Sequence, residues 1–209
     1  VDPVPAAMLR LLASIGYPVY IARPMLLPLI TCKMVTISLV AGNTAESALG
    51  YALYGALLCG ELGDIVQGLT IGSLALDLAD QYPTHPVALR THFLFDYAIR
   101  HWGENLRTII PSLLTTYHTI LQAGDSEFAA LTAHVRMVFC YFAGMELPIL
   151  EREMADTSQM IGQLHKSRHQ QINEIYRQSV LNLMGKANDP LRLCGDACDE
   201  DQALPLFHA

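Results

Sequence analysis

Residues 60–68 read GELGDIVQG, and the interpretation of this stretch decides the fold of the chain. Its three glycines precede an apolar run, as they would in a phosphate-binding loop. Such a loop follows a β-strand and leads into a Lys-Ser/Thr pair or a GxGxxG pattern. Here the preceding residues 46–59 have the composition of a helix, and no lysine lies between Lys33 and Lys166. The stretch therefore predicts a tight turn between two helices rather than a nucleotide site.

Other helix-breaking sequences recur along the chain about every twenty residues. They are GN (42–43), YPTHP (82–86), WG (102–103), GD (124–125) and GMELP (144–148). The intervening segments carry apolar residues at spacings of three and four, which is typical of one helix face. Asn43 and Glu46 fit a capping box at a helix start. Asp64 and Asp125 fit N-caps, and Pro86 fits a first helical position.

The pattern predicts an all-α fold made of antiparallel helical hairpins. Successive hairpins bury their faces against one another, so residues 1–146 are expected to form an α-solenoid with a repeat of about 40 residues. We expect residues 147–185 to form a long C-terminal helix and residues 186–209 to form an irregular tail or linker. Two alternatives stay open for 147–185. It forms one helix that pairs with another chain as in a coiled coil, or two helices broken near Gly162.

Composition limits the classes of partner. Hydrophobic residues make up 52% of the 209 residues, charged residues 16%, and the net charge is -7. Because phosphate binding needs clustered Lys and Arg, the acidic balance argues against nucleic acid. The most span-like segment, 24–42, contains Lys33 and Pro28, and its uncharged stretches are shorter than the ~20 residues a span needs. It predicts a buried helix of a soluble protein and no membrane span.

The cysteines and the first residue bear on the cellular setting. Three of the five cysteines, Cys32, Cys59 and Cys140, lie in apolar helical runs, where a free thiol packs as a small hydrophobe. An odd count with three buried thiols indicates a reducing, cytoplasmic setting. The chain begins with Val, which indicates a piece of a longer protein.

Two groups of side chains are candidates for a metal. His165 and His169 are four residues apart and are expected to share a helix face, but neighbouring cations favour a solvated face over a metal site. Cys194 and Cys198 would need two more zinc ligands, and only His208 is near in sequence. A surface turn with two free thiols is the expected structure. We assign no catalytic, cofactor-binding or metal-binding residue, and expect no cofactor.

Two further features admit alternatives. Trp102, the single tryptophan, is either an interaction anchor or a plug in the groove between hairpins, and we favour the plug. Small residues on the predicted helices either permit close packing or leave an apolar cavity for a ligand. They are Gly50, Gly55, Gly68 and Gly72.

Residues 58–83, LCGELGDIVQGLTIGSLALDLADQYP, resemble the second half of a tetratricopeptide repeat. The Gly63–Asp64 pair matches the turn of that repeat, Gly68 and Ala75 match its small positions, and Pro83 matches its end. Residues 123–135, AGDSEFAALTAHV, repeat the Gly-Asp theme. The resemblance implies a tetratricopeptide-like scaffold.

A second resemblance covers nearly the whole chain. It is carried, in this order, by residues 42–64, 100–106 (RHWGENL), 121–131 (LQAGDSEFAAL), 178–185 (QSVLNLMG) and 199–205 (DEDQALP). The series resembles the helical region of large bacterial, especially cyanobacterial, signalling kinases. Those chains join a serine/threonine kinase, an AAA-type NTPase, the helical region, a GAF sensor and a histidine kinase.

The resemblance implies a non-catalytic, cytoplasmic segment for protein interaction and signal coupling. Its expected partners are the neighbouring domains of the parent chain or another signalling protein. A homodimer through the long C-terminal helix is a further expectation. The alternative function is a small-molecule sensor that binds an apolar ligand between hairpins.

Overall fold

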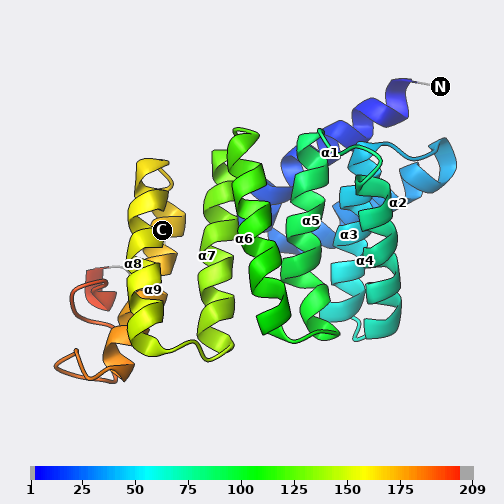
Figure 1. Cartoon of the computed structure of the whole chain (residues 1–209). Helices are drawn as coiled ribbons and strands as arrows, with labels where there is room; N and C mark the ends of the chain where they lie inside the picture. The colour runs from blue at the N-terminus through cyan, green and yellow to red at the C-terminus, as the bar shows by residue number, and fades with distance from the viewer. Residues whose placement is uncertain (1–2, 203–209) are drawn as a thin grey trace. The chain divides into compact units, whose positions relative to one another are not determined.

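The computed structural model describes residues 3–202 (Figure 1). Within that range the chain is helical and forms no β-strand, only an isolated bridge between Cys194 and Asp199. The expected all-α fold is confirmed. The helices are α1 (Pro3–Ala22), η1 (Pro24–Leu26), α2 (Leu27–Ala41), α3 (Ala45–Gly60), α4 (Ile65–Ala79), α5 (Pro86–Ala98), η2 (Arg100–Trp102), α6 (Leu106–Gln122), α7 (Ser126–Phe142), α8 (Leu147–Gln163) and α9 (Ser167–Leu183).

The GELGD stretch is a helix-to-helix turn, as predicted. Gly63 adopts a φ of 70° between α3 and α4, a conformation that glycine reaches without steric cost. Asp64 then caps α4 by accepting a hydrogen bond from the backbone N–H of Gln67 at 3.2 Å. Gly124, with a φ of 82°, and Asp125 repeat this arrangement between α6 and α7. The expected caps at both aspartates are confirmed.

The predicted capping box is shifted by one residue. Thr44, not Asn43, is the N-cap of α3, and Ser47 occupies the third helical position. The Thr44 N–H donates to the Ser47 hydroxyl at 3.0 Å. Because α3 begins at Ala45, Glu46 lies one position too early to close the box, and it accepts a hydrogen bond from the Thr44 hydroxyl instead.

The helices fall into two compact units, Val1–Asn105 and Leu106–Ala209. The boundary expected at residue 146, between the solenoid and the C-terminal segment packed on it, is a different kind of division and stays a prediction. In the first unit α3 and α4 approach closely because glycines face each other. A Cβ on Gly55 would lie 2.9 Å from the Gly68 carbonyl oxygen, and one on Gly72 would lie 3.0 Å from the ring of Phe95. A Cβ on Gly50 would lie 3.0 Å from the Cβ of Met34, and one on Gly68 would lie 2.8 Å from the Gly55 carbonyl oxygen. All four glycines singled out in the sequence thus lie against filled space.

The expectation that segment 24–42 is a buried helix is wrong. In the first unit α1 and α2 pack on each other and on α3, and each buries one face only. Met34 and Ile37 are buried on the inner face of α2, whereas Leu29 and Val40 are 67% and 84% exposed. Apolar composition alone does not show how many faces of a helix have neighbours.

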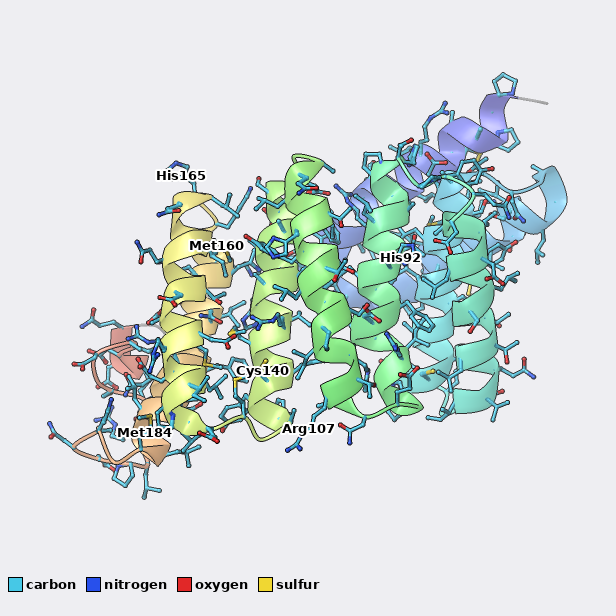
Figure 2. The ribbon with its side chains drawn as sticks, in the orientation of Figure 1. His92, Arg107, Cys140, Met160, His165 and Met184 are labelled. Carbon is cyan, nitrogen blue, oxygen red and sulfur yellow. The ribbon has the colours of Figure 1, made fainter. Side chains whose placement is uncertain are left out.

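Residues 147–185 form two helices, the second of the open alternatives. His165, at the end of α8 (Figure 2), has a φ of 57°. The N–H of His165 donates to Gly162 and that of Lys166 to Ile161, which is the hydrogen-bond pattern of a Schellman motif. The same pattern ends α6 at Gly124 and α7 at Gly144. The single long helix, which was the premise of the coiled-coil expectation, is therefore absent.

Candidate functional site

The second unit contains a polar cluster between α7, α8 and α9. We call it the α7–α9 polar cluster; it comprises Glu127, His134, Ser158, Lys166, His169 and Asn173. At one end Glu127 of α7 accepts from His169 Nε2 at 2.8 Å and pairs with Lys166 Nζ at 2.9 Å. The His169 ring is buried in this contact.

The deeper part of the cluster is buried. Asn173 is fully buried, and its Nδ2 donates to the Met154 carbonyl oxygen and the Ser158 hydroxyl at 2.9 and 2.8 Å. The His134 ring packs against Tyr176, with the centroids 5.7 Å apart. Asn173 Oδ1 and His134 Nδ1 form no hydrogen bond with any described residue. Such atoms are costly to bury.

Burial changes the protonation of this cluster. Desolvation lowers the pKa of His134 to about 4, although the Asn173 side chain acts in the opposite direction. Burial by itself raises the pKa of Glu127, but the hydrogen bonds from Lys166 and His169 outweigh it and leave that pKa below its usual value. At neutral pH His134 is therefore a neutral imidazole in the buried part of the cluster, and Glu127 is an ionised carboxylate at the end where it contacts Lys166 and His169. This arrangement fastens α7 to the α8–α9 hairpin.

The structure separates the two histidines that the sequence paired. His165 lies in the turn and is exposed, whereas His169 lies on α9 and is 3% exposed. The prediction of a shared helix face is wrong, because the chain turns at His165. The prediction of a solvated face is wrong for His169, because its ring points inward to Glu127.

The α7–α9 polar cluster was not found from the sequence. Its signal was weak: His134 stands between Ala133 and Val135, and Asn173 follows His169 by four residues on α9. Polar residues on an otherwise buried stripe indicate a buried network only when the helix that faces them is known.

The acidic segment after α9 brings together a thiol and two carboxylates. Cys194, Asp199 and Asp201 offer ligand atoms within 4.8 Å of one another. The guanidinium of Arg192 already lies 2.6 Å from Asp201, where it occupies the place of a cation. Cys194 and Cys198 are free and half-buried, and burial raises the pKa of the Cys198 thiol. His208 lies outside the described residues.

Exposed apolar side chains mark a second candidate surface, on α4 of the first unit. Leu62, Val66 and Leu74 are 66%, 74% and 50% exposed. Leu62 lies in the turn just before Gly63, and Val66 and Leu74 lie on the exposed side of α4. Trp102 of η2 is 45% exposed, which does not fit the favoured role of a buried plug. Apolar side chains grouped in this way are typical of docking surfaces.

Comparison of the chain with protein-family models, with curated proteins and with solved structures finds no significant match. By length and composition alone, Pro3–Ala22 and Pro24–Ala41 are apolar enough to cross a membrane. A core helix or a signal sequence passes the same test. The class that the described residues define is an all-α protein of two helical units.

Proposed function

We propose that this chain is a non-catalytic segment for protein interaction and signal coupling within a multidomain serine/threonine and two-component sensor kinase. We further propose that its hairpins form a tetratricopeptide-like solenoid. The kinase assignment rests on the resemblance of the five sequence segments, and the cytoplasmic location on that resemblance and on the odd number of cysteines. Of the three thiols expected to be buried, Cys59 and Cys140 are buried and Cys32 is exposed. The interaction role rests on the features of the helices described below.

Two matched hairpins support the repeat. In α3–α4 and in α6–α7 a glycine of positive φ precedes a capping aspartate. Four residues beyond each aspartate the inner face carries a small buried residue, Gly68 in one hairpin and Ala129 in the other. Small residues at this position let the two helices of a hairpin approach closely. The hairpins support only the shared turn, because α6 is the third α-helix after α3 and is out of phase with a two-helix repeat. The period of about 40 residues rests on the spacing of the helix-breaking sequences alone.

The exposed apolar face of α4 is the observation that carries the interaction role. Val66 and Leu74 lie two turns apart on α4 and point to solvent, which costs free energy unless a partner covers them. A partner that buries both residues would contact a rigid helix that is capped at Asp64. Contact with such a helix transmits a displacement along the hairpin, which is how the segment would couple two neighbouring domains.

The sensor alternative requires an apolar cavity. The glycines that suggested one lie against Met34, Phe95, Ile99 and the facing backbone of their own hairpin. A ligand would need another position between the helices. The homodimer expectation likewise needs an interface other than one continuous C-terminal helix, since α8 and α9 pack on each other.

The test compares hydrogen exchange of α4 in the isolated 209-residue chain and in the parent polypeptide read from its gene. We expect slower exchange across Ile65–Ala79 in the parent. Val66→Asp should abolish that difference, and the matched variant Gln67→Asp, also on the exposed side of α4, should retain it.

The outcomes separate the two parts of the proposal. Equal exchange of α4 in both forms would overturn the interaction role. A gene without kinase domains beside this segment would overturn the kinase assignment and leave the interaction role to be judged by the exchange data alone.

A further inference from the structure

Charge is distributed unevenly along the chain. Residues 3–45 hold three cations, Arg10, Arg23 and Lys33, and no Asp or Glu. Residues 46–209 hold the other ten of the thirteen cations and nineteen of the twenty acids, a net charge of -9. All three N-terminal cations are exposed, and none pairs with an acidic side chain of residues 3–202. The first two helices thus form the positive part of an acidic protein.

The outer face of α1 is apolar over its whole length. Val4, Met8, Leu11 and Ile15 recur at spacings of four, three and four, and all are exposed, Leu11 to 62%. The inner face of the same helix is buried through Leu9, Ala13 and Gly16. A second apolar stripe opposite the buried one is not needed for packing within the unit.

The outer face of α2 and η1 continues this surface in the same helical hairpin. Met25 is 86% exposed, and Leu29, Leu39 and Val40 are exposed on α2. Lys33 lies on the same face, one turn after Leu29. A lysine in such a place can lay its methylenes along an apolar surface while its ammonium reaches a polar layer. We call the exposed face of α1, η1 and α2 the N-terminal apolar face; Figure 1 draws these helices in blue.

We propose that the N-terminal apolar face docks the protein peripherally on an anionic lipid bilayer. Apolar side chains flanked by cations, with no acid among them, match a surface of acyl chains beneath negative headgroups. The same charge distribution opposes binding of residues 46–209 to that bilayer, so contact is restricted to α1 and α2. This proposal is independent of the function proposed above, because α4 remains uncovered.

A helix pair lying in the interface fits better than a pair crossing the membrane. Arg10 is near the middle of α1 and Lys33 near the middle of α2, so a crossing would place both cations in the hydrocarbon. Each helix also buries a face against its neighbours in the first unit, including polar Thr31 and Ser38. That packing would have to be undone for either helix to span.

The test is co-sedimentation of the 209-residue chain with vesicles of phosphatidylcholine containing about 30% phosphatidylserine. We expect binding that is weakened by high salt and is much weaker on phosphatidylcholine alone. Leu11→Glu and Leu29→Glu should each abolish it. The matched variant Leu183→Glu, on α9 and exposed to the same 62% as Leu11, should bind as the unmodified chain does. Arg10→Gln, Arg23→Gln and Lys33→Gln should each weaken binding about fivefold.

Circular dichroism and light scattering complete the design. Each variant must retain the helical spectrum of the unmodified chain to count. No binding of the folded chain, or equal loss in Leu183→Glu, would overturn the proposal. Binding that resists high salt would overturn the peripheral mode in favour of insertion. A dimer in the absence of lipid that Leu11→Glu dissociates would show that a second copy covers the face instead.

Discussion

At the scale of single residues, the glycines of α3 and α4 act through the space beside them. A Cβ on Gly68 would collide with Cys59 Sγ and lie 2.8 Å from the Gly55 carbonyl oxygen. A Cβ on Gly60, the last residue of α3, would meet nothing within 4 Å. We expect Gly68→Ala to destabilise the protein by about 1–3 kcal/mol through overpacking. Gly60→Ala should stabilise it by about 0.5–1 kcal/mol through helix propensity.

Urea unfolding followed by circular dichroism measures both changes. The two substitutions add the same methyl group to helices of the same unit, so they differ only in the space available. If Gly68→Ala proved as well tolerated as Gly60→Ala, the close approach of α3 and α4 would be disproved.

His134 makes stability depend on pH. Its pKa is about 4 in the folded state and about 6.5 when unfolded. Between these values the unfolded chain binds one more proton, so the free energy of unfolding decreases as pH falls through this window. The slope is about 1.4 kcal/mol per pH unit, and the total loss is about 3 kcal/mol by pH 4. Above pH 7 the contribution is fully present.

Unfolding in urea at pH 7 and pH 5 tests this expectation. His134→Gln should remove most of the dependence in that range and leave a smaller part from His101, whose pKa is also lowered by burial. Glu127, whose pKa is lowered, contributes only at lower pH. His118→Gln, at an exposed position on α6, should leave it unchanged. Equal pH slopes in all three proteins would show that His134 is not buried as neutral imidazole.

At the scale of the helices, the glycine turns were predictable because positive φ selects glycine. Gly63 and Gly124 therefore located the ends of α3 and α6 correctly. The break between α8 and α9 was left open because His165, not glycine, occupies the left-handed position of that Schellman motif. The α7–α9 polar cluster joins Glu127 to His169, 42 residues away, and no local pattern reports such a pairing.

His165→Gly should stabilise the α8–α9 turn. The left-handed conformation destabilises a non-glycine residue by about 1–2 kcal/mol, and glycine removes this strain. Glycine also has more freedom in the unfolded chain, which lowers the stability by about 0.5–1 kcal/mol. We expect a net gain of up to about 1 kcal/mol in the free energy of unfolding. The matched variant Arg168→Gly, exposed on α9, should lose about 1 kcal/mol instead.

Thermal and urea unfolding distinguish the gain in stability expected for His165→Gly from the loss expected for Arg168→Gly. The same kind of substitution has opposite effects three residues apart because only His165 has a positive φ. A loss of stability in His165→Gly as large as that in Arg168→Gly would mean that α8 and α9 form one continuous helix in solution.

At the scale of the whole molecule, the sequence established helices and turns but not how they group. Regular breakers predict a uniform array, whereas the contacts divide the chain at Asn105. The second unit has its own core, made by Met137, Cys140, Leu150, Met154 and Val180. The spacing of helices along a sequence does not reveal such a division, because the same kinds of turn residues connect helices within a unit and between units.

The division predicts that residues 106–209 fold without the first unit. A unit of about 100 residues with its own core is large enough for independent stability. We expect this fragment to be helical, to unfold cooperatively on heating, and to protect the amides of α7 from exchange as the whole chain does. Arg107, the second residue of α6, helps to hold the unit closed, because its guanidinium donates to the Ala143 carbonyl oxygen at 2.9 Å (Figure 2).

Residues 126–209 are the matched control. This shorter fragment lacks α6, which packs against α7 and supplies the Arg107 contact to the end of α7. It should lose cooperative unfolding and α7 protection, because removal of α6 exposes apolar surface of α7 to water. If both fragments were equally unfolded, the core around Met137 would depend on the first unit, and the chain would fold as one cooperative array despite its division at Asn105.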